Sequence, residues 1–163
     1  MDLGLTDRAC IVTGGSRGIG LQVARQLVAE GARVLLVGRG EDALKAAAEQ
    51  CEGDARTVSW LALDITEPDA GERTVAACRE RFETVDVVVN SAGTSQVRSI
   101  EALTDEEWQA MWEIHVMGPM RLMRAAIPEM AERGWGRIVN VSSSSGKRPS
   151  PSNAARRHHS AAP

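Results

Sequence analysis

Short apolar runs alternate with longer amphipathic stretches along most of the chain. Apolar runs rich in Val, Ile and Leu predict five strands, at residues 9–12, 34–37, 58–63, 85–89 and 138–141. Between them, apolar residues recur at helical spacing, which predicts a helix ending near Gly31, helices at 41–50 and 67–82, and a helical region from 104 to about 133. This alternation with short connections predicts a parallel sheet wrapped by helices on both faces.

Local signals sharpen the bounds of these helices. Pro68 stands in the tolerated first turn of its predicted helix. Thr104 followed by Glu107 predicts a capping box at the start of the long helical region. Within that region, Gly118-Pro119 and Pro128 predict irregularities, because proline cannot donate a helical hydrogen bond.

Composition and charge narrow the class of protein. The 163 residues suffice for one domain, and 43% hydrophobic with 25% charged residues is ordinary for a globular chain. A formal net charge of -3 argues against nucleic-acid binding by charge, and no apolar run reaches the roughly 18 residues of a membrane helix. The N-terminus lacks a secretory signal pattern, and Cys10, Cys51 and Cys78 have neither disulfide nor metal-ligand spacing. We therefore expect a cytoplasmic protein with reduced thiols, no metal and no membrane partner.

A glycine-rich turn, Thr13 to Gly20, separates the first predicted strand from the first predicted helix. Gly14 allows a tight reversal after the strand, Gly18 allows the backbone to approach a phosphate, and Gly20 allows the helix to pack close to the strand. Free N–H groups and the positive end of the helix dipole then face the anion. This strand, turn and helix setting predicts a site for the pyrophosphate of a dinucleotide.

Four motifs, in the same order, resemble the short-chain dehydrogenase/reductase family. They are the TGxxxGIG turn at 13–20, Asp64 after the third strand, Asn90-Ser91-Ala92-Gly93 after the fourth, and residues 136–143 over the fifth. The resemblance extends to about Ala155 and implies an α/β fold, a Rossmann-type doubly wound parallel sheet truncated after the fifth strand. It also implies hydride transfer between a nicotinamide and a small carbonyl or alcohol substrate, as in 3-oxoacyl thioester reductases, sugar or polyol dehydrogenases or hydroxysteroid-type enzymes.

The resemblance assigns the cofactor site to the glycine-rich turn and to the ends of the next three strands: Gly14, Ser16, Arg17, Gly18, Ile19, Gly20, Arg39, Asp64, Ile65, Asn90, Ala92 and Gly93. An acid at the end of the second strand favours NAD, whereas a basic residue there suits the 2′-phosphate of NADP. Arg39 occupies that end with Arg17 close by, while Glu41 and Asp42 belong to the next helix. We therefore expect NADP(H) rather than NAD(H). The alternative is that both arginines are solvated surface charges.

In the resembled family a serine, a tyrosine and a lysine carry the chemistry, and an asparagine in the fourth helix supports the lysine. Ser143 matches the serine, although it also belongs to a polar serine run. His115 stands in place of the asparagine, or is simply a buried helical histidine with one partner. The tyrosine and lysine positions fall at Arg156 and Ser160, and the sequence contains no tyrosine. Because a guanidinium is not a usable proton donor near neutral pH, we expect this chain to be inactive.

The resemblance fails abruptly at Arg156, as a frameshift or premature end would produce. We divide the chain into an incomplete NAD(P)-binding domain, 1–150, and a disordered or aberrant tail, 151–163. A non-catalytic nucleotide-binding remnant is the alternative function. Six Lys or Arg and no acid follow Glu132, but no aromatic residue follows Trp135 to stack on bases, which disfavours a nucleic-acid arm.

The resemblance also implies a homo-oligomer, since family members pair through the long fourth helix and the helix after it. Only the first of those helices falls within this chain, which argues against pairing. Trp108 and Trp112 are one helical turn apart on it. We expect these tryptophans to pack in the core rather than in a dimer face.

Overall fold

The computed structural model describes residues 3–54, 56–95 and 100–143. Within them, five parallel strands form one sheet: β1 (Ala9–Thr13), β2 (Arg33–Gly38), β3 (Val58–Ala62), β4 (Val87–Asn90) and β5 (Arg137–Asn140). The helical elements are α1 (Gly18–Ala29), α2 (Glu41–Gln50), α3 (Ala70–Phe82), the 3-10 turn η1 (Ile100–Ala102), α4 (Asp105–Trp112), the π-helical turn η2 (Glu113–Met117) and α5 (Gly118–Glu132). The expected tail, with Arg156 and Ser160, lies outside the described residues.

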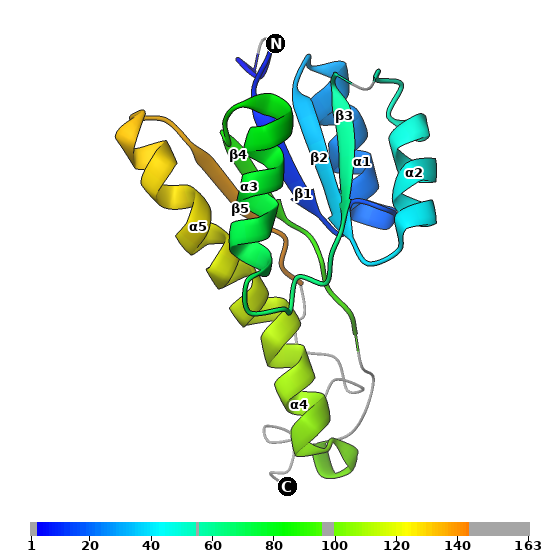
Figure 1. Cartoon of the computed structure of the whole chain (residues 1–163). Coiled ribbons are helices and arrows are strands. Elements are labelled where there is room, and N and C mark those ends of the chain that lie inside the picture. Colours follow the sequence, from blue (N-terminus) through cyan, green and yellow to red (C-terminus); the bar gives the residue numbers. More distant parts are fainter. Residues whose placement is uncertain (1–2, 55, 96–99, 144–163) are drawn as a thin grey trace, which may run out of the picture.

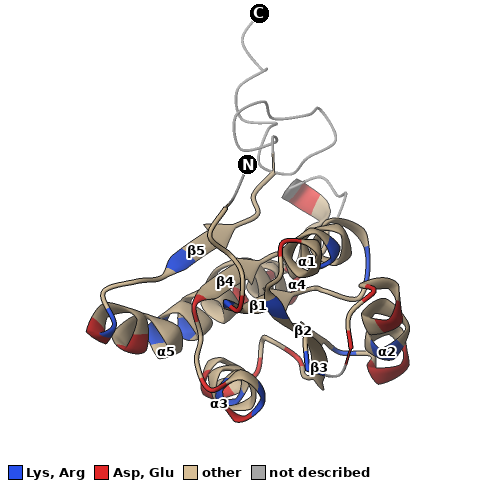
Figure 2. Ribbon diagram, turned by 90° about the horizontal axis from the view of Figure 1, so that it is seen from above, with Lys and Arg blue, Asp and Glu red and all other residues tan. Residues whose placement is uncertain are grey.

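Helices cover both faces of the sheet, as the unbroken apolar strands predict. Helices α1 and α2 lie on one face, and α3 and α5 lie on the other (Figures 1 and 2). Because successive strand residues point to opposite faces, Cys10 and Val12 of β1 pack in the α1–α2 core. Ala9 and Ile11 pack in the α3–α5 core, and all four residues are fully buried. The predicted doubly wound architecture is confirmed.

The strands lie in the order β3-β2-β1-β4-β5, so the chain crosses from one side of β1 to the other between β3 and β4. At such a switch point the loops after neighbouring strands diverge and leave a crevice at the carboxyl ends of the strands. Here the crevice lies beyond Thr13 of β1 and Asn90 of β4, which are paired in register. The fold thus places the candidate site between the glycine-rich turn and the segment that follows β4.

A buried carboxylate ties elements together at the opposite end of the sheet. Asp86, which is 4% exposed, accepts a hydrogen bond from the Ala9 amide at 3.0 Å. Its other oxygen lies 3.2 Å from the Arg133 guanidinium and 3.5 Å from that of Arg8. Arg8 in turn stacks on Trp135, 3.8 Å from the ring centroid. These partners compensate for the hydration that the buried carboxylate loses.

Of the three predicted helix starts, the structure confirms those at Glu41 and after Thr104 but not the one at Glu67. The capping box is present, since the Glu107 amide donates to Thr104 Oγ1 and the Thr104 amide donates to the Glu107 carboxylate. Pro68, in contrast, precedes α3 instead of lying in its first turn. The Ala70 amide donates to the Glu67 carbonyl, so a tight turn around Pro68 comes before the helix begins at Ala70.

The long helical region has its irregularity at η2, just before Gly118-Pro119, whereas α5 continues through Pro128. The expectation that Trp108 and Trp112 belong to the core is wrong, because their exposed fractions are 55% and 47%. Helix α4 extends beyond the sheet formed by the described residues, away from its strands (Figure 1). The helical pattern predicted the element correctly but not its position relative to the sheet.

Strand β5 forms one edge of the sheet within the described residues. It pairs with β4, and Val139 and Val141 are 48% and 38% exposed. Exposed apolar strand edges favour association with other chains.

Candidate functional site

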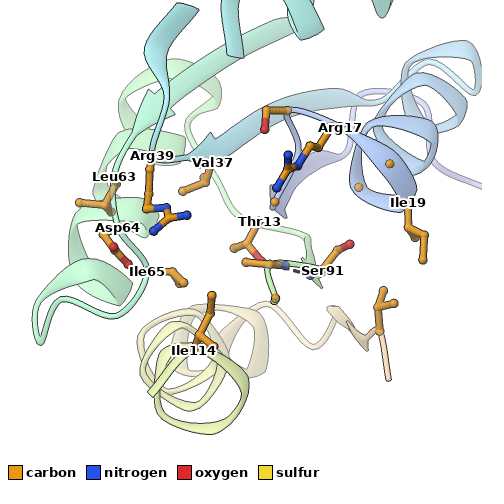
Figure 3. Close-up of a pocket in the computed structure, with 18 residues that line it drawn as sticks. Thr13, Arg17, Ile19, Val37, Arg39, Leu63, Asp64, Ile65, Ser91 and Ile114 are labelled. Carbon is orange, nitrogen blue, oxygen red and sulfur yellow. Dashed lines mark hydrogen bonds between the residues drawn. The ribbon is translucent and has the colours of Figure 1, made fainter. Parts of the chain in front are cut away.

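A cavity of about 320 Å³ opens at the switch point. Its walls come from the glycine-rich turn, the ends of β2 and β3, the segment after β4, and η2 (Figure 3). The predicted cofactor-binding residues other than Asn90 all line it: Gly14, Ser16, Arg17, Gly18, Ile19, Gly20, Arg39, Asp64, Ile65, Ala92 and Gly93. Motifs that are far apart in the sequence therefore converge on one cavity.

Three glycines of the turn meet different physical demands. Gly14 adopts a φ of +67°, and a Cβ there would lie 2.8 Å from the Cα of Ala92. Gly20 lies so close to the Gly14 carbonyl that any Cβ would collide with it. Gly18 adopts a φ of +57°, and nothing lies within 4 Å of its Cβ position. The turn therefore packs tightly at Gly14 and Gly20 and leaves open space at Gly18, where a ligand can approach the backbone.

The first turn of α1 faces this cavity. Its N-cap is Arg17, whose side chain makes no capping hydrogen bond within the described residues, and Gly18, Ile19 and Gly20 follow along the cavity wall. The first N–H groups of a helix have no intrahelical acceptor, and they carry the positive end of the helix dipole. This end of α1 is therefore suited to an anionic ligand.

Thr13 joins the end of β1 to the segment after β4. Its Oγ1 accepts hydrogen bonds from the Ser91 and Ala92 amides, each at 3.1 Å, and donates to the Val89 carbonyl at 3.5 Å. The Thr13 side chain is buried, so these bonds satisfy a hydroxyl that water does not reach. The sequence analysis used Thr13 only as the start of the turn, because contacts with residues nearly eighty positions away leave no local pattern.

Two arginines and one carboxylate supply the charge of the cavity. Arg17 and Arg39 both line it, and their side chains extend into it (Figure 3). Asp64 Oδ1 accepts hydrogen bonds from the Thr66 amide at 3.0 Å and from the Thr66 hydroxyl at 2.8 Å. Partial burial opposes ionisation of Asp64, but the Thr66 hydrogen bonds and the Arg39 charge outweigh it and lower the pKa of Asp64. The cavity therefore holds a carboxylate that stays ionised beside Arg39.

The two predicted catalytic residues lie at the margin of the cavity. His115 is exposed rather than buried, and its Nε2 lies 2.8 Å from the Thr94 carbonyl oxygen. Ser143 is also exposed and follows shortly after Val141, which lines the cavity. The catalytic roles of His115 and Ser143 stay predictions.

Asn90 is the predicted cofactor-binding residue that does not line the cavity. It is 4% exposed, and its amide nitrogen donates to the Asn140 side chain at 2.8 Å. In this arrangement Asn90 joins β4 to β5 at the carboxyl end of the sheet.

The cavity also has apolar walls that the sequence analysis did not identify: Val37, Leu63, Ile114 and Val141. Val37, Leu63 and Val141 belong to apolar runs, where nothing distinguishes a cavity residue from a core residue. Ile114 lies on η2, and its direction depends on a helical irregularity that only the folded chain defines.

A parallel sheet of this strand order, with a glycine-rich turn at its switch point, defines the Rossmann-type class of folds. Residues 8–155 match the family described as short chain dehydrogenase. The chain belongs to this family of oxidoreductases, which use nicotinamide cofactors.

Individual relatives support the same assignment. An uncharacterised oxidoreductase of Staphylococcus epidermidis is 34% identical over 148 residues, which make up 91% of this chain and 63% of that protein. An uncharacterised oxidoreductase of Bacillus subtilis is 32% identical over 151 residues, 93% of this chain and 57% of that one. The chain thus spans about three fifths of the length of these relatives.

Solved structures give the same picture. The L-sorbose reductase of Gluconobacter frateurii, solved with NADPH and L-sorbose, superimposes with a TM-score of 0.87 at 35% identity, covering 94% of this chain and 59% of that one. A short-chain dehydrogenase/reductase of Brucella melitensis, described as a glucose/ribitol dehydrogenase, has a TM-score of 0.85 at 28% identity, covering 94% and 64%.

The described residues also bear on membrane insertion, metal binding and thiol chemistry. In this part of the chain no helix has the length and apolar character needed to cross a bilayer, and no group of His, Cys, Asp or Glu is arranged to hold a metal ion. Cys10, Cys51 and Cys78 are free thiols and are buried. Burial raises the pKa of Cys10 and of Cys78 to about 12, so neither is a nucleophile near neutral pH.

Proposed function

We propose that this chain binds NADP(H) as a member of a family that transfers hydride between the nicotinamide and a small carbonyl or alcohol substrate, and that this 163-residue polypeptide does not itself catalyse the transfer. The observation that carries the proposal is the cavity at the switch point, where the open backbone at Gly18 and two arginines face the same space. An L-sorbose reductase that was solved with NADPH has the same fold over this region, which supports the choice of cofactor and the substrate class.

The residues present fit an NADP-type dinucleotide. The start of α1 would hold the pyrophosphate through its backbone N–H groups, since Gly18 leaves room for close approach. Arg17 and Arg39 would bind the 2′-phosphate, and Glu41 and Asp42 do not compete because they occupy the first turn of α2. The nicotinamide, when bound, supplies or accepts the hydride.

The chain's own residues provide only part of the catalytic chemistry. The Ser143 hydroxyl would hold the substrate oxygen by a hydrogen bond, with His115 in a supporting position. These 163 residues include no tyrosine, and Arg156 and Ser160 stand where the family places its proton donor and its lysine. An unperturbed tyrosine titrates near 10 and needs a neighbouring cation to donate its proton at neutral pH. Arg156 cannot supply that proton and Ser160 cannot supply that positive charge. We therefore propose nucleotide binding without turnover for this polypeptide.

A cytoplasmic location is also part of the proposal. The three thiols are free and buried in three separate elements, β1, α3 and the end of α2. Unpaired cysteines are typical of proteins that work in a reducing compartment.

The test of cofactor binding is a fluorescence titration of the 163-residue chain with NADPH and with NADH. We expect NADPH to bind at least tenfold more tightly, which corresponds to about 1.4 kcal/mol. Arg39→Ala should remove most of that preference by weakening NADPH alone, since NADH has no 2′-phosphate. Arg25→Ala is the matched control, because Arg25 is an exposed arginine on α1 that does not line the cavity.

Three outcomes would count against the proposal. Equal affinities for NADPH and NADH would overturn the preference for NADP(H). Absence of binding by either nucleotide would overturn the assignment of the cavity. Measurable NADPH-dependent reduction of a carbonyl compound by the purified chain would overturn the predicted inactivity.

A further inference from the structure

The π-helical turn η2 interrupts the helical region between α4 and α5. The Gly118 amide donates to the Glu113 carbonyl, five residues back instead of four. Pro119 follows and has no N–H, so the regular helical bond is lost at this point. Single π-helical turns inside helices occur frequently at functional sites, because they redirect a few side chains without ending the helix.

One side of η2 is linked to the segment after β3 by hydrogen bonds of Arg121. Arg121 Nη1 donates to the Glu113 carboxylate at 2.8 Å and to the Thr66 carbonyl at 3.1 Å. The two side chains are only 15% and 28% exposed, so this ion pair is shielded from solvent more than a surface pair. Gly118 lies against the same segment, since a Cβ on it would be 2.9 Å from the Ile65 carbonyl oxygen. The helix therefore contacts this segment through both a side chain and the backbone.

The other side of η2 is linked to the segment after β4 by a hydrogen bond of His115. His115 Nε2 lies 2.8 Å from the Thr94 carbonyl oxygen, and because a carbonyl only accepts, Nε2 carries the proton. The imidazole also lies against Gly93, where a Cβ would be 2.8 Å from His115 Cε1. The backbone of Gly93 is not left-handed, so its conformation does not demand glycine. Glycine is needed there because a side chain would collide with the His115 ring.

Between these two attachments, Ile114 lines the cavity across from the glycine-rich turn (Figure 3). Ile65 and Gly93, which belong to the two attached segments, line it as well. We propose that η2 is a clamp in which Arg121, with Glu113, and His115 position Ile114 and both flanking segments, and so set the width of the cofactor cavity. Arg121 and His115 act as positioning residues. The inference rests on the proposed function, since it assumes that the cavity binds a dinucleotide.

The clamp differs from the two cavity arginines in what it controls. Arg17 and Arg39 would contact the 2′-phosphate, so their loss should change the preference for NADPH over NADH. The clamp shapes a wall formed by apolar and backbone groups, which both dinucleotides would share. Loss of the clamp should therefore weaken NADPH and NADH by the same factor and leave their ratio unchanged.

The experiment uses the full 163-residue chain and the substitutions Arg121→Met, His115→Ala and His115→Gln. Arg124→Met is the control, because Arg124 is an exposed arginine one turn further along α5. Dissociation constants for NADPH and NADH are measured by fluorescence, and unfolding midpoints are measured without nucleotide. We expect Arg121→Met and His115→Ala to weaken both nucleotides about tenfold, about 1.4 kcal/mol. His115→Gln should restore binding, because the glutamine amide can place an N–H near the position of Nε2.

Several results would overturn the clamp. Unchanged affinities for Arg121→Met and His115→Ala would do so, as would a change in the ratio of NADPH to NADH affinity. The residues would only stabilise the fold if the variants with the lowest unfolding midpoints also had the weakest binding and His115→Gln did not restore it. If the unsubstituted chain binds neither nucleotide, the proposed function fails and the clamp fails with it. Binding by the unsubstituted chain with insensitive variants overturns the clamp alone.

Discussion

The region around β1 and β2 and the region around β5 and α4 are packed to different degrees. Every residue of β1 is buried, whereas β5 exposes Val139 and α4 exposes both of its tryptophans. The glycine-rich turn follows β1 in the first region, and the candidate catalytic residues Ser143 and His115 belong to the second region. The proposed nucleotide site therefore consists largely of backbone held by a closed core, whereas the candidate catalytic residues are exposed side chains near an open edge.

A large effect should come from Asp86, which joins the two regions at the end of the sheet opposite the cavity. Asp86→Ala removes the acceptor of the Ala9 amide and leaves Arg8 and Arg133 without their shared carboxylate. We expect a loss of roughly 3 kcal/mol in the free energy of unfolding, measured by urea denaturation. Glu41→Ala, which breaks an exposed ion pair on α2, should cost less than about 1 kcal/mol. Equal losses for both variants would show that the contacts of Asp86 contribute no more to stability than an exposed ion pair.

A matched pair of glycines separates folding from binding. Gly18 and Gly134 have φ values of +57° and +67°, and neither has an atom within 4 Å of its Cβ position. Each substitution by alanine should therefore cost a similar 1–2 kcal/mol or so, from the left-handed backbone alone. Only Gly18→Ala should also weaken NADPH binding, because its methyl group would enter the cavity. Comparable NADPH affinity in the two variants would contradict the role of Gly18.

Alkaline pH compares the two cores directly, since Cys10 lies in the α1–α2 core and Cys78 in the α3–α5 core. Burial raises both pKa values from 9.0 to about 12 in the folded chain. A raised folded pKa gives stability that is fully present below pH 9 and is lost as pH rises from 9 towards 12. We expect the free energy of unfolding to fall by roughly 1 kcal/mol per thiol between pH 8 and pH 10.

Cys78→Ala should reduce that alkaline loss, which urea denaturation at the two pH values measures. A disulfide reagent at pH 8 gives the complementary reading, because modification then requires local or global opening. Similar protection of Cys10 and Cys78 would show that both cores are equally closed. Much faster modification of Cys78 would show that the α3–α5 core opens more readily than the α1–α2 core.

The smallest effects should come from the exposed apolar residues of the second region. Trp108→Gln and Val139→Thr should each change the free energy of unfolding by less than about 0.5 kcal/mol, because neither side chain is buried. Leu122→Ala, at a fully buried position of α5, should cost roughly 2–5 kcal/mol. A large loss for Trp108→Gln would indicate that this side chain is covered in solution, and sedimentation of the same samples would detect self-association.

Much of the fold and of the site could be predicted from the sequence. The five apolar runs became the five strands, and the residues assigned to the cofactor site line one cavity, except Asn90. The strands could be predicted because hydrophobic period acts locally, whereas the residues of the cofactor site follow from the family resemblance and their roles stay predictions. The core position of Trp108 and Trp112 was wrong because helical spacing shows which side chains share a face, but not what that face meets.

The sequence alone determined that a strand leads through a glycine-rich turn into a helix, since glycine adopts the left-handed backbone of Gly14 and Gly18 without the steric cost that other residues meet. It also determined the order of strands and helices along the chain. Only the tertiary structure decided that Thr13 bonds the segment after β4 and that Arg121 and His115 hold η2 between two loops. Those contacts join residues 21 to 79 positions apart, and such distances leave no period or spacing that a sequence pattern can carry.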